Sequence, residues 1–209
     1  MSKKSASNSL CDLVRSEAHR LMTQMDPDPR HALQVCRLAL DLFDQLIPLH
    51  GFGGDERFIL ECAALLHDIG WAVNPSAHHK GSHDAILAEP LGGLDENRRL
   101  LVALVARYHR KSHPQRKHEG YCNLPQNERR VVRILASILR IADGLDRSHT
   151  DNVTEIACDL YEEGVRLRLV TRTSARDELY GLQKKSGLFE EVFGLTVWPQ
   201  LVPNLSDCK

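Results

Sequence analysis

The chain has 209 residues, 42% of them hydrophobic and 26% charged, as in a globular protein with one domain or one domain and a small appendage. A formal net charge of −1 and an aromatic content of 5% argue against specific nucleic-acid binding. No apolar run has the length of a membrane span, and the opening segment MSKKSASNSL lacks the apolar core of a secretory signal. We therefore expect no membrane association.

The cysteines indicate the redox compartment in which we expect the protein. None of them belongs to a Cys-x-x-Cys pair, so the sequence holds no thiolate zinc site of the usual spacing. They are Cys11, Cys36, Cys62, Cys122, Cys158 and Cys208. We expect free thiols in a reducing, cytoplasmic compartment.

The first half of the chain predicts helices. Residues 1–9 are polar and are expected to be flexible, whereas the apolar stripe of residues 10–24 predicts an amphipathic helix. The prolines of DPDPR break the chain, and a second helix is expected from Pro29 to about Ile47. A third helix is expected after the glycine-rich HGFGGD, from Asp55 to a stop at Gly70.

The second half changes character near Asp151. Before it, NRRLLVALVARYHR and ERRVVRILASILRIADGLDRS predict two helices with 3.6-residue periodicity. After it, VTEIACDL and VRLRLVT alternate around a turn and predict a β-hairpin, followed by a helix over about Ala175–Phe193 and a third strand at LTVWP. The predicted fold is mainly α, with a helical bundle over residues 1–150 and a small α+β C-terminal element over 151–209 packed on it.

The strongest local signal is AALLHDIG, in which His67 and Asp68 end an apolar helix. A histidine and an aspartate beside such an apolar run are costly unless they are paired or bind a ligand. Taken alone, the dipeptide also has the commoner explanation of a histidine facing free helix-end carbonyls and an aspartate that caps a neighbouring turn.

Further candidate ligands stand at other expected helix ends. His31 opens the second helix, Asp143 lies near the end of the long helix, and His79 and His109 lie at helix termini, where surface histidines are also common. Imidazole and carboxylate groups together suit Mn, Fe, Ni, Co or Zn, and the carboxylates also admit Mg. Such ions produce a nucleophilic water near neutral pH.

Positive charge lies beside several of these residues. Lys80 follows His79, and Arg147 lies four residues after Asp143 on about the same helical face. Both are candidates for binding phosphate oxygens. The basic run from Arg107 to His118 has either this role or that of a solvated loop.

The order His31, His67-Asp68, Asp143 resembles the H…HD…D pattern of the HD superfamily of metal-dependent phosphohydrolases. The segments LLHDIGWAVN, HHKGSHDAIL, ALVARYHRK and ILRIADGLDRSH are similar to the C-terminal HD-like domain of the exopolyphosphatase / guanosine pentaphosphate phosphohydrolase (Ppx/GppA) family. The resemblance covers most of residues 29–200. It implies an HD-type bundle in which His31, His67, Asp68 and Asp143 bind a first divalent ion. His79 and His109 would serve a second.

The resemblance also implies a function. A metal-activated water would attack the phosphorus of a nucleotide, a polyphosphate-related compound or another small phosphate-containing substrate. Asp68 would orient that water, while Lys80 and Arg147 stabilise the phosphoryl oxygens. The ion, one or two per chain, would be Mn, Fe, Mg or another transition metal.

One departure leaves an alternative open. Members of that family cleave polyphosphate on a pair of N-terminal actin-like domains, for which this sequence has no room. The alternative is a non-catalytic module that binds nucleotide or polyphosphate and regulates a partner, with a separate actin-like phosphatase protein as one candidate. A homodimer formed through the alternating run at 153–171 is compatible with either function.

Overall fold

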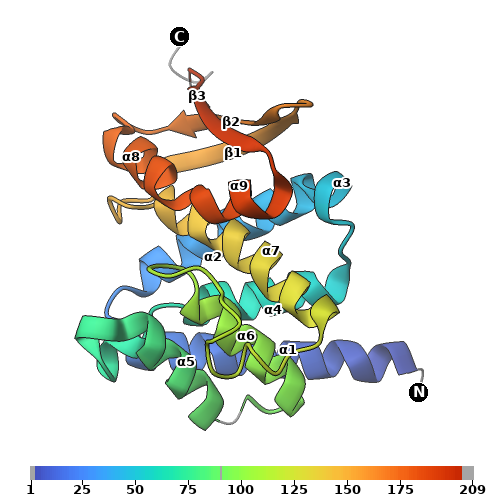
Figure 1. Cartoon of the computed structure of the whole chain (residues 1–209). Coiled ribbons are helices and arrows are strands. Elements are labelled where there is room, and N and C mark those ends of the chain that lie inside the picture. The colour runs from blue at the N-terminus through green and yellow to red at the C-terminus, as the bar shows by residue number, and fades with distance from the viewer. Residues whose placement is uncertain (1–2, 90, 204–209) are drawn as a thin grey trace.

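A computed structural model describes residues 3–89 and 91–203, and the side chains from Ser9 onward. In chain order, the elements are α1 (Lys3–Met25), α2 (Pro29–Gln45), α3 (Ile47–His50), α4 (Gly54–Leu66), η1 (Ile69–Ala72), η2 (Pro75–Ala77), α5 (His78–Ala88), α6 (Glu96–Arg107), α7 (Gln126–Gly144), β1 (Val153–Leu160), β2 (Gly164–Thr171), α8 (Arg176–Lys185), α9 (Gly187–Phe193) and β3 (Thr196–Leu201). The predicted mainly α fold with C-terminal strands is confirmed (Figure 1).

The N-terminal prediction needs correction. The first helix was expected over residues 10–24, but α1 begins at Lys3, within the segment 1–9 for which flexibility was expected. The helix extends because adding a residue to an existing helix costs much less than starting one. The predicted helix over Ala175–Phe193 is in fact two helices, α8 and α9, separated at Ser186.

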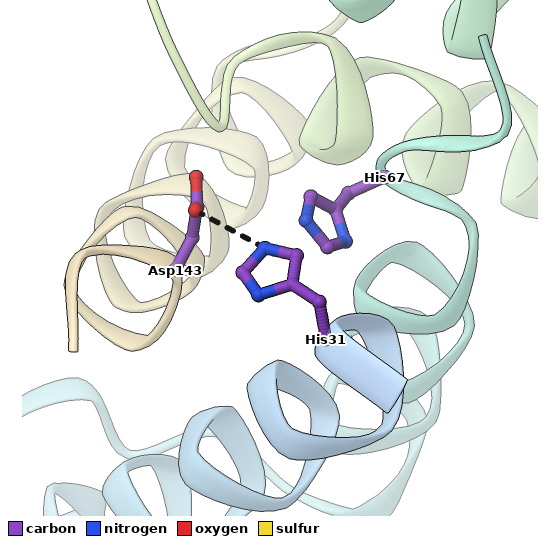
Figure 2. Close-up of side chains that lie close together, drawn as sticks. All are labelled: His31, His67 and Asp143. Carbon is purple, nitrogen blue, oxygen red and sulfur yellow. Dashed lines mark ion pairs between the residues drawn. The ribbon is translucent and has the colours of Figure 1, made fainter. Parts of the chain in front are cut away.

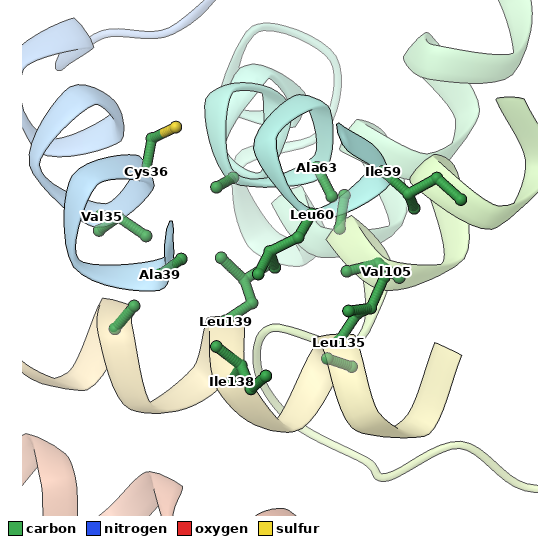
Figure 3. Packing of buried hydrophobic residues seen from close by; sticks show 14 of the residues in the cluster. Val35, Cys36, Ala39, Ile59, Leu60, Ala63, Val105, Leu135, Ile138 and Leu139 are labelled. Carbon is green, nitrogen blue, oxygen red and sulfur yellow. The ribbon is translucent and has the colours of Figure 1, made fainter. Parts of the chain in front are cut away.

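The core lies between α2, α4, α6 and α7. Figure 3 shows Leu135 and Leu139 of α7 pointing between the facing helices, where they meet Leu60 of α4 and Val105 of α6. All four are fully buried, and each such side chain stabilises the fold by roughly 1.5–3 kcal/mol. This packing fixes the ends of the same helices, on which the candidate ligands lie.

The sheet lies at the end of the molecule opposite α1 and α5 (Figure 1). Its order is β1-β2-β3, with β1 antiparallel and β3 parallel to β2. Val165, Leu167 and Leu169 of β2 are buried, as the alternation predicts. The sheet meets the bundle where β1 contacts α2, while α8 and α9 pack on α7.

Two glycine contacts bring elements unusually close. A Cβ on Gly70 would lie 2.0 Å from the backbone oxygen of His78, and a Cβ on Gly181 would lie 2.1 Å from that of Gly144. Only glycine allows these approaches. The first joins η1 to α5, and the second joins α7 to α8, so both set the position of side chains described below.

No helix in the described ranges is long and apolar enough to cross a membrane. The cysteines of those ranges are all free thiols.

Candidate metal centre

Six side chains from helix ends converge on one place, where five of them line a pocket and the sixth, His67, is buried beside it. His31 stands in the first turn of α2, where the side chain of Asp28 caps the helix by accepting from the His31 backbone N–H. His67 follows α4, and Asp68 precedes η1. The other three are His78 at the start of α5, His109 just after α6 and Asp143 in the last turn of α7. They form two groups of three.

The first group is His31, His67 and Asp143, whose ligand atoms all lie within 4.8 Å of one another. Figure 2 shows the ring of His31 pointing at Asp143, with 3.6 Å between Nε2 and Oδ1. His31 Nδ1 donates to Oδ2 of Asp146 at 2.8 Å, and His67 Nδ1 donates to the carbonyl of Ala64 at 2.8 Å. These bonds fix both rings so that Nε2 faces the pocket, as second hydrogen bonds do for metal-binding histidines.

The second group is Asp68, His78 and His109. Asp68 Oδ1 lies 3.3 Å from His78 Nε2 and 3.5 Å from His109 Nε2. His109 Nδ1 donates to the carbonyl of Ala106 at 2.7 Å, which again leaves Nε2 for the pocket. Asp68 Oδ2 lies 3.7 Å from His67 Nε2, so Asp68 stands between the two groups.

Two of these atoms are buried without a hydrogen bond among the described residues: His67 Nε2 and Asp68 Oδ1. A buried lone pair without a donor costs about 1–3 kcal/mol, so each such atom requires an explanation. A divalent cation would satisfy both atoms, and a mixed imidazole–carboxylate set suits one. The residues present therefore fit a metal ion.

The pKa values of several residues in the cluster are strongly shifted. Burial opposes a charge on His31, but hydrogen bonds and the charges of Asp143 and Asp146 outweigh it and raise its pKa to about 10. Burial likewise opposes ionisation of Asp143, yet Lys185 and His31 hold its pKa well below its usual range. Burial lowers the pKa of His109 and keeps it neutral, the form in which imidazole binds a metal.

The pocket has a volume of about 710 Å³ and contains protein cations beside the candidate ligands. Lys185 of α8 forms an ion pair with Asp143, and Arg110 Nη1 donates to His78 Nε2 at 2.8 Å. Arg147 lines the pocket, with its guanidinium over the ring of Tyr180 at 4.9 Å. The cleft thus combines metal-binding groups with cations that suit a phosphate ligand.

Two of the expected site residues lie elsewhere. His79 and Lys80 line a separate pocket of about 170 Å³ together with Arg107 and His118. Adjacent helical residues point about 100° apart, so when His78 faces Asp68 its neighbour faces away. His78 thus occupies the place expected for His79, and Arg110 and Lys185 supply the charge expected from Lys80. The structure does bring His31, His67, Asp68, His109, Asp143 and Arg147 together.

Several residues of the pocket were not predicted from the sequence. Asp26 lies in the DPDP break before α2, is 7% exposed, and its Oδ2 is buried without a partner in the described structure. The ring of His149 stacks on that of His31 at 3.9 Å, from a backbone with φ of 57°. The acidic residue Asp26, shortly before His31 in the sequence, could have been recognised as a pocket residue. No sequence feature indicated that α8 packs here and brings Lys185 to the pocket.

Comparison with known proteins identifies the family. The profile described as Ppx/GppA phosphatase, domain III, matches residues 14–182. A guanosine-5'-triphosphate,3'-diphosphate pyrophosphatase from Pseudoalteromonas atlantica is 28% identical over 146 residues, which are 69% of this chain. The chain spans 28% of the length of that relative. Because the domain profile covers most of the sequence, the chain belongs to the Ppx/GppA phosphatase family, through its domain III.

Proposed function

We propose that the chain is a metal-dependent phosphohydrolase whose reaction takes place in the pocket around Asp68. The observation that carries the proposal is the pair of buried atoms, His67 Nε2 and Asp68 Oδ1, that have no partner in the described residues, on neighbouring residues of which Asp68 lines the pocket. The family relationship supports a phosphatase-related function.

The residues that would hold metal are the two groups of three. His31, His67 and Asp143 would hold one ion, and Asp68, with His78 and His109, a second or a shared one. A divalent ion such as Mn, Fe or Mg supplies Lewis acidity and activates water at neutral pH. Because each ring of His31, His67 and His109 is held through Nδ1, the ligand atoms need little movement on binding, and His31 would release its Nε2 proton as the ion binds.

The cations of the chain would bind the substrate. Arg110 and Arg147 line the pocket, and their planar guanidinium groups match two oxygens of a phosphate group. Lys185 is held at the pocket by Asp143 and adds a third positive charge where charge develops on phosphoryl oxygens. Trp71, stacked on His78 with ring centroids 4.3 Å apart, offers an aromatic face at the pocket.

A nucleotide or another small phosphate compound is the substrate class we propose. The volume of about 710 Å³ lies in the range of small-molecule sites. The relative from Pseudoalteromonas atlantica is named for a guanosine nucleotide that it cleaves.

The test is phosphate release by the full chain, stripped with chelator and then supplied with Mn or Mg. Substrates would be p-nitrophenyl phosphate, pyrophosphate and guanosine nucleotides. We expect release that depends on added metal and falls about a hundredfold or more in Asp68→Asn, while His79→Gln, just outside the pocket, retains it. Metal binding without release from any substrate would contradict catalysis and favour the non-catalytic module.

A further inference from the structure

A second pocket, of about 580 Å³, lies beside the first turns of α7, between the loop before that helix and the end of α9. It shares no lining residue with the metal pocket. Its lining includes four arginines, Arg116, Arg129, Arg130 and Arg133, and we call it the arginine pocket.

Most of this charge is uncompensated within the described residues. Arg133 pairs with Glu191 at 2.7 Å, and that carboxylate is shared with His113. Arg116, Arg129 and Arg130 have no described carboxylate within ion-pair distance, so the arginine pocket holds a surplus of positive charge.

Two of the guanidinium groups are held in place by the protein. Arg129 Nη1 donates to the carbonyl of Leu124 at 2.6 Å, and Arg130 Nη2 donates to that of His50 at 3.0 Å. The Arg130 guanidinium also lies over the ring of Phe52, 4.8 Å from its centroid. Groups already held lose little conformational entropy when they bind a ligand.

The arrangement is unfavourable without an anion. Arg129, Arg130 and Arg133 are spaced so that like charges face one another along α7, which destabilises a helix. Arg129 also lies in the first turn of α7, where the helix dipole disfavours cations. A bound anion would remove both penalties.

Apart from Gln126 and the Glu191 carboxylate that pairs with Arg133, the rest of the lining is mostly apolar and indicates what else the ligand carries. Leu49, Ile134 and Phe193 contribute to it, together with the buried ring of Tyr121. A simple inorganic anion would leave this surface unused. A molecule with phosphate groups on an aromatic body would use both halves.

We propose that the arginine pocket binds a nucleotide, with its phosphates on the arginines and its base on the apolar side, independently of the metal centre. Arg116 is the most direct probe, because it is exposed and makes no side-chain bond to a described residue. Its replacement therefore leaves the fold intact.

The test is calorimetric titration of the full chain with ADP, and separately with pyrophosphate, in chelator and low salt. We expect ADP to bind more tightly than pyrophosphate. Arg116→Ala should weaken ADP binding about tenfold, whereas Arg20→Ala, an exposed arginine on α1, and Asp68→Asn should leave it unchanged. Arg129→Gln provides a second variant in the arginine pocket.

Three results would overturn the proposal. They are no ADP binding at millimolar concentration, binding that is unaffected by both Arg116→Ala and Arg129→Gln, and binding lost in Asp68→Asn. Pyrophosphate binding as tightly as ADP would overturn the nucleotide assignment, because the apolar side would then contribute nothing.

Discussion

The metal pocket and the arginine pocket are built in opposite ways. In the metal pocket, ligands from separate helices converge, and each of three histidines is aimed by a hydrogen bond to its Nδ1. In the arginine pocket, one helix contributes three of the four cations, and their charge lacks matching carboxylates in the described part of the chain. The metal pocket depends on how separate helices approach one another, whereas the arginine pocket depends on the spacing of charged residues along α7. Substitutions should therefore affect the two pockets separately.

The largest expected effect is at the contact that positions the metal pocket. Gly70→Ala would place a Cβ 2.0 Å from the backbone oxygen of His78, so α5 must move away from η1. We expect a loss of about 3 kcal/mol or more in the free energy of unfolding, measured by urea denaturation. Gly54→Ala, where a Cβ meets nothing within 4 Å, is the matched control and should change stability little. Equal effects of the two variants would contradict the role of the close contact.

The next comparison separates adjacent histidines of α5. His78→Gln removes a ring 3.3 Å from Asp68 and should weaken metal affinity roughly 10–100-fold. His79→Gln, in the neighbouring small pocket, should leave affinity unchanged. Calorimetric titration of each variant with Mn measures both affinities. A larger loss of metal affinity in His79→Gln than in His78→Gln would favour His79 as the metal ligand, as expected from the sequence.

A smaller effect is expected at Lys185. Its ion pair with Asp143 neutralises a candidate ligand, so Lys185→Met should strengthen Mn binding a few-fold, since a cation no longer competes. The same variant should reduce phosphate release, because it removes a charge that would bind the substrate. Metal affinity and activity that fall together would show instead that Lys185 mainly supports the structure.

The smallest effect concerns pH. Burial, reinforced by Arg110 and other nearby cations, lowers the pKa of His79 from 6.5 to about 4. The folded state thus binds this proton more weakly than the unfolded state, so stability is full above about pH 6.5 and falls as the pH approaches 4. His79→Gln should flatten this decline in urea denaturation of the chelator-treated protein. His19→Gln, on the exposed face of α1, should not.

Much of the fold was predictable from the sequence, because helices and strands leave periodic patterns. The hairpin of β1 and β2 and the burial of Val165, Leu167 and Leu169 followed from alternation alone. The split of α8 from α9 was missed, although the Ser186-Gly187 dipeptide at the break is a recognised turn signal.

The candidate site was predictable only where ligands lie at helix ends within recognisable motifs, as for His67 and Asp68. Choosing His78 over His79 required the rotation of α5, which the contact between Gly70 and Gly81 sets. Lys185 and the arginine pocket depend on how α8 and α9 dock on α7. From sequence alone, Arg129, Arg130 and Arg133 resemble an ordinary solvated helix face.

The most direct test of the metal centre is elemental mass spectrometry of protein purified without chelator or affinity nickel, comparing the parent chain with Asp68→Ala. We predict about one or two equivalents of a transition metal such as Mn or Fe, or binding restored by added Mn or Mg, and loss of that metal in the variant. A parent chain that binds none of these ions even when they are added would contradict this prediction.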